Sequence, residues 1–403
     1  MFDCSITDGT PGASAEADAV GWFDPIALPA STRSRHVERI RDAMTTRAGP
    51  RSGYWRPGIQ APVILFGGQG AERLVSVASA QNIARHWRSA TLLLLRQRGD
   101  VVIVPHQTLA AHARPFEEEL AAEQLAPYGD SLDRALARVR DERRVLVTAL
   151  HGGAGEDGQV AAICERLGIP FTASGSTASA LAWDKVMAKA CAAAAGLQTA
   201  PSLVIQPSAT LAYTPALAKW LHTYGALVAK PVRDGSSHGI RFLDTERACS
   251  ELLSHDRHGT YLVEPLLRGS EASVGVVDTP LGPRALEPVE IQLQAGAQFD
   301  YEHKYLGHGV LELCPSTYPP DVVRALRVAA ETIHRETGAW GYSRSDFILT
   351  DVGPALLELN VLPGMTQTSL FPKALAAEGI ELGEFLRTQA ALAIARAVLR
   401  WST

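Results

Sequence analysis

The stretch LLELNVLPGMTQTSL, residues 356–370, places polar side chains in what reads as a buried strand running into a turn. Glu358 and Asn360 lie two positions apart. Because side chains alternate between the two faces of a strand, both should share one face. The stretch RSDFILTD, residues 344–351, predicts a neighbouring strand whose Asp346 could lie opposite them. Three polar side chains are therefore expected on one face of a strand pair.

Two chemistries fit these three side chains. Two carboxylates and an amide oxygen form a hard-oxygen set that suits Mg²⁺, with water and phosphate oxygens filling the remaining positions. Alternatively, Asp346 and Glu358 simply form ion pairs, for instance with Arg344, since buried carboxylates need a partner. The strand pair alone leaves both interpretations open.

Composition and charge exclude several classes of protein. The chain has 403 residues, of which 46% are hydrophobic, enough for two or three domains. A net charge of -5 and a pI of about 6.2 give no indication of binding to nucleic acid or to an acidic membrane. No run of roughly 20 apolar residues predicts a transmembrane helix, and the N-terminus does not read as a secretory signal. Five scattered cysteines without a CxxC pair predict reduced thiols in a cytoplasmic protein.

The order of predicted elements divides the chain into four parts. Residues 1–60 are rich in Gly, Pro, Ala and Ser, and we expect a poorly structured extension there. Residues 61–173 alternate strands with helices, which predicts an open parallel α/β sheet with sites at the C-terminal ends of its strands. Residues 174–264 open with a helix from Asp184, after which strands dominate, and residues 265–403 form a second α+β segment. Periodicity and capping predict a helix that ends at Trp87 and further helices at residues 131–144, 156–168, 184–196, 319–338 and 382–401.

The loop KPVRDGSSHG, residues 230–239, joins two predicted strands. Gly235 permits a positive φ, so the amides of Ser236 and Ser237 could point at phosphate oxygens, and Lys230 could hold another phosphate. A plain hairpin loop explains the same residues, because DG turns are common in hairpins. The loop is not a P-loop, since GxxxxGK[ST] does not occur in the chain.

The stretch FGGQGAERLVS, residues 66–76, follows a strand and opens a helix, which invites a dinucleotide-binding interpretation. That interpretation fails because Arg73 stands where the third glycine should be. Glu72, near the start of the helix, either complements the helix dipole or holds a substrate ammonium group. His151 closes a predicted strand, where a lone histidine is more often structural than catalytic.

Taken together and in order, eight stretches resemble the D-alanine–D-alanine ligase family, which has the ATP-grasp fold. They are LFGGQGAERLVSVAS, ALHGGAGEDG, ASGSTASALAWDKVMAK, KPVRDGSSHGI, VEPLLRGSEASVGV, FDYEHKYLG, SRSDFILTD and ELNVLPGMTQTSLFPKALAAEGI. The resemblance runs from about Ala61 to the end of the chain, and the last stretch is highly specific. It implies an N-terminal α/β substrate domain at 61–173, a central ATP-grasp subdomain at 174–264, and a C-terminal one at 265–403 with the metal and catalytic site.

The resemblance also implies a reaction. ATP would convert the carboxylate of one D-alanine into an acyl phosphate, and the amine of a second D-alanine would then displace phosphate. Two Mg²⁺ ions, or Mn²⁺, would assist, and the product would serve peptidoglycan synthesis from the cytoplasm. Amino acids and ATP are the expected partners, without nucleic acid or membrane, and a homodimer is a possible assembly. A loop such as QFDYEHKYLGHG should close over the site and exclude water.

Site residues carry over where the motifs match. The two-magnesium site matches Asp346, Glu358 and Asn360. Nucleotide contacts match Lys185 and Lys230 at the phosphates, Glu264 and Leu267 beside adenine, and Glu271 at the ribose. The reaction centre matches Glu72 at the first ammonium group, Arg344 and Gly364 at the oxyanion, and Ser236 with Tyr305 as a hydroxyl pair linked to that glutamate. Substrate contacts match His151, Lys304, Ser369 and Leu370.

Three departures from the family pattern put the substrates in question more than the fold. Leu74 stands where an acid is usual, Ser343 and Ser345 flank Arg344 in place of glycine and an apolar residue, and the N-terminal extension lies outside the family core. The first hypothesis is D-alanine–D-alanine ligation. The second is the same chemistry on another amino acid or acceptor, in a biosynthetic or resistance pathway. The third, a non-catalytic nucleotide-binding homologue, is disfavoured because the metal and lysine positions are retained.

Overall fold

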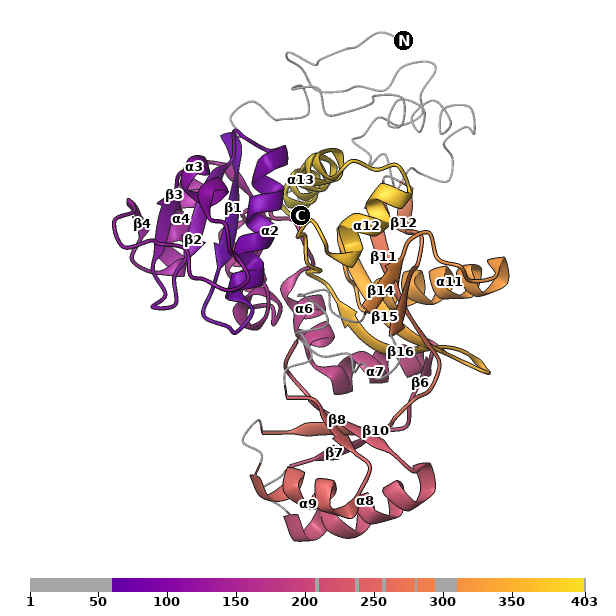
Figure 1. The fold of residues 1–403 in the computed structure, drawn as a ribbon. Coiled ribbons are helices and arrows are strands. Elements are labelled where there is room, and N and C mark those ends of the chain that lie inside the picture. Colours follow the sequence, from indigo (N-terminus) through magenta and orange to yellow (C-terminus); the bar gives the residue numbers. More distant parts are fainter. Residues whose placement is uncertain are drawn as a thin grey trace. The chain divides into compact units, whose positions relative to one another are not determined.

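The computed structural model describes residues 60–206, 210–235, 239–255, 259–279, 281–293 and 310–401 (Figure 1). The predicted N-terminal extension therefore lies outside the described residues, apart from its last position. None of the described helices combines the length and apolar character needed to cross a bilayer. The cysteines in the described ranges carry free thiols, as predicted; they are Cys164, Cys191, Cys249 and Cys314.

The first described segment forms a five-stranded sheet in the order β4-β3-β2-β1-β5. Its strands are β1 (Gln60–Gly67), β2 (Thr91–Leu95), β3 (Val101–Val104), β4 (Pro127–Gly129) and β5 (Arg144–Thr148). The predicted parallel arrangement holds for β2, β1 and β5 but is wrong for β3 and β4, which run antiparallel to their neighbours. Only residues 96–100 separate β2 from β3, too few for the crossover that parallel strands need.

Three helices accompany this sheet where the sequence predicts them, α2 (Arg73–His86), α4 (Leu132–Asp141) and α5 (Gln159–Leu167). The sequence analysis did not expect the short helix α3 (His106–Ala111) or the 3-10 turn η1 (Gly153–Gly155) before α5. Ser131 caps α4 as predicted, because its Oγ accepts a hydrogen bond of 3.3 Å from the Arg134 amide. Gly168 follows α5 at a φ of 68°, a left-handed conformation that suits glycine.

The described part of residues 174–264 adds four helices, one short strand and a second sheet. The first two helices are α6 (Ser176–Trp183) and α7 (Lys185–Ala194), and the short strand is β6 (Gln198–Thr199). The sheet, in the order β7-β10-β8-β9, comprises β7 (Leu203–Ile205), β8 (Leu227–Pro231), β9 (Arg241–Leu243) and β10 (Tyr261–Pro265). Asp184 caps α7, since its Oδ1 accepts from the amides of Val186 and Met187.

Three helices of this segment were not expected from the sequence, namely α6, α8 (Thr210–Tyr224) and α9 (Glu246–His255). The last two lie together against the four-stranded sheet in Figure 1. Leu217 of α8 and Leu252 of α9 are buried in the same core as the strands. The sequence analysis emphasised the strands here, and Pro215 within α8 weakens its helical pattern.

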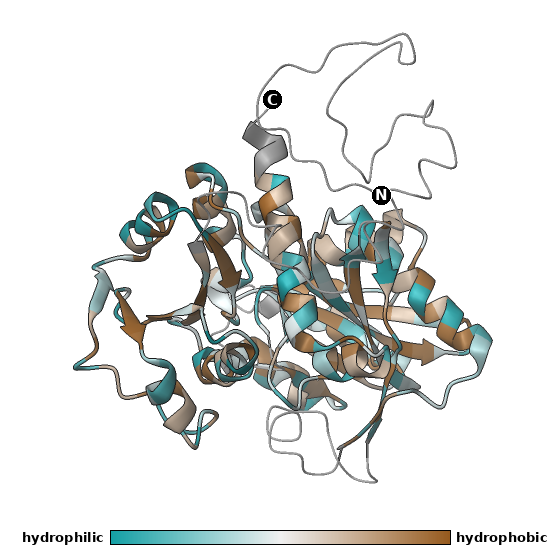
Figure 2. Cartoon of the chain, turned by 90° about the horizontal axis from the view of Figure 1, so that it is seen from above, coloured by the Kyte–Doolittle hydropathy of each residue, from teal (hydrophilic) through white to brown (hydrophobic). Residues whose placement is uncertain are grey.

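The C-terminal part contains the largest sheet, in the order β14-β13-β11-β15-β16-β6, with β12 paired to β11. Its further strands are β11 (Ser270–Thr279), β12 (Gly282–Ala285), β13 (Val289–Leu293), β14 (Val310–Leu313), β15 (Tyr342–Thr350) and β16 (Gly353–Asn360). The strand β6 pairs with β16, so residues 174–264 contribute to both of the last two sheets. Hydrophobic residues concentrate on the strands, which Figure 2 shows mostly in brown.

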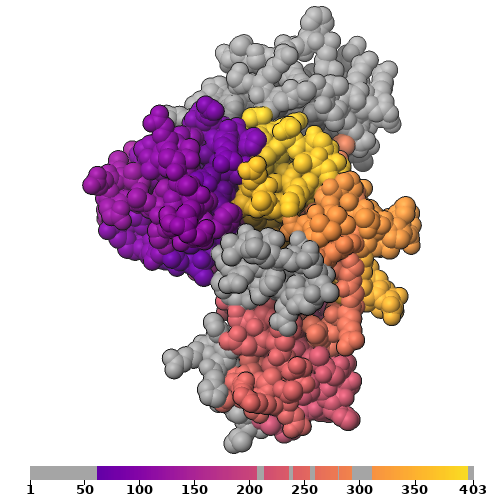
Figure 3. Space-filling model, in the orientation of Figure 1, coloured from indigo at the N-terminus to yellow at the C-terminus, as the bar shows by residue number. Residues whose placement is uncertain are grey.

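The remaining helices are α11 (Pro320–Glu336), α12 (Leu370–Ala377) and α13 (Leu382–Trp401). The helix α13 packs against α2 and β5, and Figure 3 shows the yellow C-terminal residues against the indigo N-terminal ones. Val63 of β1 and Phe385 of α13 belong to one buried hydrophobic cluster. This shared core holds α2 next to the loop that follows β16, which determines how the candidate site is assembled.

Candidate active site

The strand pair singled out in the sequence forms as predicted. The strands β15 and β16 are antiparallel, with Asp346 opposite Glu358 and Arg344 opposite Asn360. Opposed residues of an antiparallel pair point to the same side of the sheet, so the four polar side chains gather on one face. The register shifts directly after Asp346, and such irregularities often occur next to active sites.

Arg344 joins the two carboxylates. Its Nε and Nη2 atoms donate to Asp346 Oδ1 and Oδ2 at 3.0 and 2.7 Å, and Nη2 lies 3.7 Å from Glu358 Oε1. Ser273 Oγ donates a further hydrogen bond of 2.6 Å to Asp346 Oδ1. The ion pairs expected for these acids are therefore present, and the bidentate one is of the strong kind.

The same side chains also fit a magnesium ion when other oxygens are supplied. Each carboxylate oxygen has two lone pairs, so the contacts to Arg344 and Ser273 leave acceptor capacity on Asp346. The Glu358 side chain is 34% exposed, and Asn360 Oδ1 accepts from the Leu362 amide at 2.8 Å. Within the described ranges, no three His, Cys, Asp or Glu side chains are grouped as a metal site. Two carboxylates and one amide oxygen fit Mg²⁺ when phosphate and water supply its other ligands.

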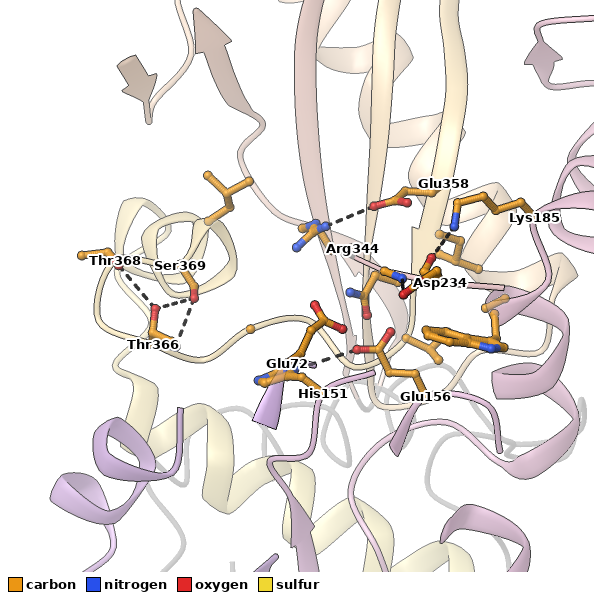
Figure 4. Close-up of a pocket in the computed structure, with 18 of the residues that line it drawn as sticks. Glu72, His151, Glu156, Lys185, Asp234, Arg344, Glu358, Thr366, Thr368 and Ser369 are labelled. Atoms are coloured by element: carbon orange, nitrogen blue, oxygen red, sulfur yellow. Dashed lines mark hydrogen bonds and ion pairs between the residues drawn. The ribbon is translucent and has the colours of Figure 1, made fainter. Parts of the chain in front are cut away.

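Two cavities meet at this strand pair. The larger has about 850 Å³, a volume typical of small-molecule sites. The smaller has about 70 Å³, room for roughly five water molecules. Lys185, Asp234, Gly235 and Glu358 line both. Figure 4 shows Lys185, Asp234 and Glu358 together beside the smaller cavity, so the two cavities adjoin along these residues.

The larger cavity collects the residues predicted to contact a nucleotide. Its lining includes Lys185, Lys230, Glu264, Leu267 and Glu271, together with Asp346 and Glu358 of the candidate metal site. Lys230 on β8 and Glu264 on β10 form an ion pair, with 2.8 Å between Nζ and Oε2. Ser237, the remaining predicted nucleotide contact, lies outside the described residues.

A buried lysine that the sequence analysis did not single out completes an ion triad. Lys189 of α7 contacts Glu264 Oε1, and its Nζ also donates to the Ala200 carbonyl at 2.8 Å. Burial lowers the pKa values of Lys189 and Lys230 to about 8, which leaves both mainly protonated at neutral pH. Two cations thus hold the Glu264 carboxylate in place at the wall of the larger cavity.

The smaller cavity collects the predicted reaction-centre and substrate residues that the structure describes. They are Glu72, His151, Arg344, Gly364, Ser369 and Leu370. These residues come from the start of α2, the loop after β5, and β15 with the loop after β16 (Figure 4). Ser236, Lys304 and Tyr305 lie outside the described residues, so the structure does not test the predicted hydroxyl pair.

The Glu72 carboxylate is closely surrounded by glycine backbone. A Cβ atom on Gly152 would lie 2.6 Å from Glu72 Oε2, and one on Gly235 would lie 3.0 Å from the same oxygen. Gly152 also has a φ of 63°, which disfavours larger residues. The Glu72 side chain makes no capping hydrogen bond to α2. The alternative stated above, in which Glu72 serves only the start of the helix, is therefore not supported by a capping hydrogen bond.

Glu156 is a further carboxylate in the smaller cavity, which Glu72 and Glu358 also line. It is 9% exposed, and its Oε1 accepts from the Gly152 amide at 3.0 Å. Burial raises the pKa of the Glu156 carboxyl, and the nearby Glu358 raises it further. The sequence analysis did not single out this residue, although it lies in the matched stretch ALHGGAGEDG.

The turn around Gly364 is closed by hydroxyl groups. A Cβ atom on Gly364 would lie 2.9 Å from Ser369 Oγ. Ser369 Oγ accepts from the Thr366 amide at 3.1 Å and lies 2.6 Å from Thr366 Oγ1. Leu370 then begins α12. The loop predicted to carry an oxyanion donor is thus compact and leaves little room for a side chain at Gly364.

The unusual serines beside Arg344 face away from the cavities. Side chains alternate along β15, so Ser343 and Ser345 lie on the opposite face from Arg344, and both are fully buried. Ser343 Oγ lies 2.7 Å from His334 Nδ1 of α11, which fixes the strand to that helix. Ser345 Oγ has no hydrogen-bond partner among the described residues.

Comparison with known families covers most of the chain. The family described as "D-ala D-ala ligase N-terminus" matches residues 62–174, and the one described as "D-ala D-ala ligase C-terminus" matches residues 192–388. The two matches leave out the N-terminal extension and include every predicted site residue except Lys185.

Individual relatives and solved structures agree with this match. A D-alanine–D-alanine ligase from Geobacter sulfurreducens is 36% identical over 322 residues, 79% of this chain and 89% of the relative. One from Leptospira interrogans is 32% identical over 337 residues, 80% and 94% of the two chains. The solved D-alanine–D-alanine ligase of Coxiella burnetii has a TM-score of 0.68 at 23% identity, over 86% of this chain and 97% of that one. The VanG D-Ala:D-Ser ligase of Enterococcus faecalis has a TM-score of 0.67 at 24% identity, over 83% and 99%. These structural likenesses confirm the predicted fold.

Proposed function

The chain belongs to the D-alanine–D-alanine ligase family, and we propose that it joins two D-alanines while converting ATP into ADP and phosphate. One observation in the structure supports this proposal independently of family membership. A nucleotide-sized cavity and a small polar cavity adjoin at Lys185, Asp234, Gly235 and Glu358. This arrangement supports a reaction in which the terminal phosphate of a nucleotide meets the carboxylate of a small substrate.

The larger cavity is the proposed ATP site. Lys185 and Lys230 would neutralise phosphate oxygens, because both are cations at the cavity wall. Leu267 and the clamped Glu264 would flank adenine, and Glu271 would accept from the ribose. Ser237 belongs to the same proposed phosphate loop. The proposed limits remain 61–173 for the substrate domain, and 174–264 and 265–403 for the two ATP-grasp subdomains.

Asp346, Glu358 and Asn360 are the proposed ligands of Mg²⁺, which when bound neutralises phosphate charge during phosphoryl transfer. Arg344 would then exchange part of its contact with Asp346 for the reacting groups. Its Nη2 atom lies 3.7 Å from Glu358 Oε1, so a small movement of the Arg344 side chain would be enough to change its hydrogen-bond partners. Arg344 therefore links the proposed metal ligands to the proposed reaction centre.

The smaller cavity is the proposed site of bond formation. Glu72 would hold the ammonium group of the first D-alanine, since a buried carboxylate attracts a cation strongly. The carboxylate of that D-alanine takes the γ-phosphoryl group, which gives an acyl phosphate and ADP. The amine of the second D-alanine attacks the acyl carbon, the oxyanion forms beside Arg344 and the Gly364 amide, and phosphate leaves. Ser369 and Leu370 would contact the second substrate, and Ser236, Lys304 and Tyr305 would complete the site.

The test is to measure phosphate release and dipeptide formation together. The protein is incubated with ATP, Mg²⁺ and each member of a panel: D-alanine, L-alanine, D-serine and D-lactate. We expect D-alanine alone to give one D-alanyl-D-alanine per phosphate, with no turnover when ATP is omitted. Greater product formation from a D-alanine mixture with D-serine or D-lactate would mean that the acceptor differs. Absence of phosphate release with every substrate would contradict the proposed activity and favour a non-catalytic homologue.

A further inference from the structure

Helix α2 buries a row of polar side chains. Ser76, Ser79 and Asn82 follow one another at intervals of three residues, so they lie near one face of the helix. Their exposed fractions are 0%, 0% and 8%. Buried polar groups need hydrogen-bond partners, so the partners of this row show what the helix holds in place.

The first member of the row serves the N-terminal sheet itself. Ser76 Oγ accepts from the Gly67 amide at 2.7 Å and donates to the Ala149 carbonyl at 2.7 Å. Gly67 ends β1 and Ala149 directly follows β5, so Ser76 ties together two neighbouring strand ends. This contact lies within one sheet and has no direct connection to the C-terminal part.

The next two members reach the loop after β16. The Met365 amide donates to Ser79 Oγ at 3.2 Å, and Asn82 Nδ2 donates to the Met365 carbonyl at 2.8 Å. Both backbone polar groups of Met365 are therefore satisfied by α2, although nearly three hundred positions separate the partners. The Met365 amide belongs to the peptide bond that follows Gly364, so its position is coupled to that of the turn.

His151 extends the same network. Its Nε2 lies 2.8 Å from Ser79 Oγ, and its Nδ1 lies 3.9 Å from Oε1 of Glu156. Burial lowers the pKa of His151 to about 4, so the imidazole is neutral at physiological pH and can donate at one nitrogen while accepting at the other. Because Ser79 Oγ accepts from Met365, its own hydrogen is available for His151 Nε2.

We propose that Ser79, Asn82 and His151 form a backbone clamp that fixes the turn at Gly364 against α2. The three are positioning residues, because Ser79 and Asn82 bind the backbone of the loop, and His151 contacts Ser79 and lies near Glu156. The inference rests on the proposed function of Gly364 as an oxyanion donor. It also changes the role expected for His151, from substrate contact to support of the loop.

The clamp gives α2 a double role. Glu72, the proposed ligand of the first ammonium group, directly precedes α2, and the clamp lies further along the same helix. Figure 4 shows His151 beside Glu72 at the cavity. A single rigid helix thus sets the distance between the ammonium site and the oxyanion donor. Displacement of about 1 Å in such a pair can lower a rate roughly hundredfold.

The first test measures the loop in the ligand-free protein by amide hydrogen exchange. Ser79→Ala removes the acceptor of the Met365 amide, so we expect exchange there to accelerate about tenfold. Asn82→Ala should accelerate exchange in the same loop peptide. The matched control is Gln81→Ala. Gln81 also lies on α2, but its Nε2 donates to the carbonyls of Leu109 and His112 and not to the loop after β16. This measurement does not depend on the reaction that the protein catalyses.

The second test separates turnover from substrate affinity. We expect Ser79→Ala and Asn82→Ala to lower kcat by about ten- to a hundredfold, as expected for a misplaced oxyanion donor, with the KM of ATP and of the first amino acid changed less than about twofold. Gln81→Ala should keep kcat near that of the natural protein. His151→Phe should behave like Ser79→Ala, and the double variant should lose little more, because both act through one network.

Specific outcomes would overturn the clamp. If His151→Phe raises the KM of the first amino acid and leaves kcat unchanged, His151 contacts substrate. If the Ser79 and Asn82 variants lower the melting temperature without faster exchange in the loop, the residues only stabilise the fold. Should Ser79→Ala fail to fold, Asn82→Ala carries both readouts alone. A natural protein without ligase activity would contradict the proposed function but would leave the exchange result valid.

Discussion

The two cavities differ in how much of the chain builds them. The larger is lined mainly by residues 226–292, with contributions from Lys185 and from β15 and β16. The smaller joins the start of α2, the loop after β5 and the loop after β16. A nucleotide site of this kind can be built largely from neighbouring strands. The smaller cavity, the proposed site for the small substrates, depends on packing between α2 and the loop after β16, so its shape is sensitive to distant changes.

The largest expected effect concerns the two carboxylates of the proposed metal site, Asp346 and Glu358, which line the larger cavity. Glu358→Gln should lower ligation by on the order of a thousandfold or more, because hard dications need anionic oxygen ligands. Asp346→Asn should do the same, although it also weakens the bidentate pair with Arg344. Steady-state turnover at saturating Mg²⁺ is the measurement, with circular dichroism to show that both variants fold. Near-normal turnover in either variant would contradict the proposed role of that residue as a metal ligand.

The next effect should separate the cavities. Glu72→Gln keeps the shape of the side chain and removes its charge, so the apparent affinity for the first amino acid should fall by one to two orders of magnitude, about 1.5–3 kcal/mol. The KM of ATP and of the second amino acid should change little. Leu74, in place of a second acid, suggests that Glu72 acts alone, but Glu156 in the same cavity brings the expected loss toward the lower end.

The matched control is Glu271→Gln in the larger cavity. It should raise the KM of ATP and leave both amino-acid constants unchanged, because Glu271 lines only the larger cavity. Separate titration of the two amino-acid sites is feasible when they saturate at different concentrations. Equal weakening of ATP and both amino acids by Glu72→Gln would mean that Glu72 is structural.

The parts that could be predicted from sequence are those with local patterns. The strands β15 and β16 and the helices α7, α11 and α13 follow from alternation, periodicity and caps within each segment. The family resemblance added the expected site residues, and the cavities bring the described ones together. The predicted direction of β3 was wrong because the alternation of strands and helices favoured a crossover connection, whereas a short turn joins β2 to β3.

The parts that could not be predicted depend on partners far away in the chain. Lys189 lies 75 positions from Glu264, and Ser79 lies 286 positions from Met365. Serines within a helix read as weak helix formers, and only the fold shows that they are buried against a loop. A useful local signal was present in α2, where Ser76, Ser79 and Asn82 recur at intervals of three residues on the side of the helix that also carries buried apolar residues.

A smaller effect is expected at the buried ion triad of the larger cavity. Lys189→Met keeps the length of the side chain and leaves Glu264 with Lys230 as its cation. We expect the KM of ATP to rise about tenfold and the free energy of unfolding to fall by about 1–3 kcal/mol, since a buried charge loses a hydrogen-bonded partner. The KM of the first amino acid should stay within about twofold. A rise in that constant as large as the rise for ATP would show that the two cavities are not separable.

The smallest effect is expected from removal of the N-terminal extension. No described lining residue of either cavity precedes Glu72, and the extension is rich in residues that do not build a hydrophobic core. A shortened chain that starts near Gly58 retains β1, which begins at Gln60 and lies in the N-terminal sheet. We therefore expect its kcat and all its KM values to stay within about twofold of the full chain, the scatter of near-neutral changes. Steady-state assays of both chains, at equal folded concentration, provide the comparison. A shortened chain that folds and binds ATP but no longer ligates would place the extension at the smaller cavity or at an interface that this cavity needs. The smaller cavity would then depend on the extension as well as on α2 and the loops after β5 and β16.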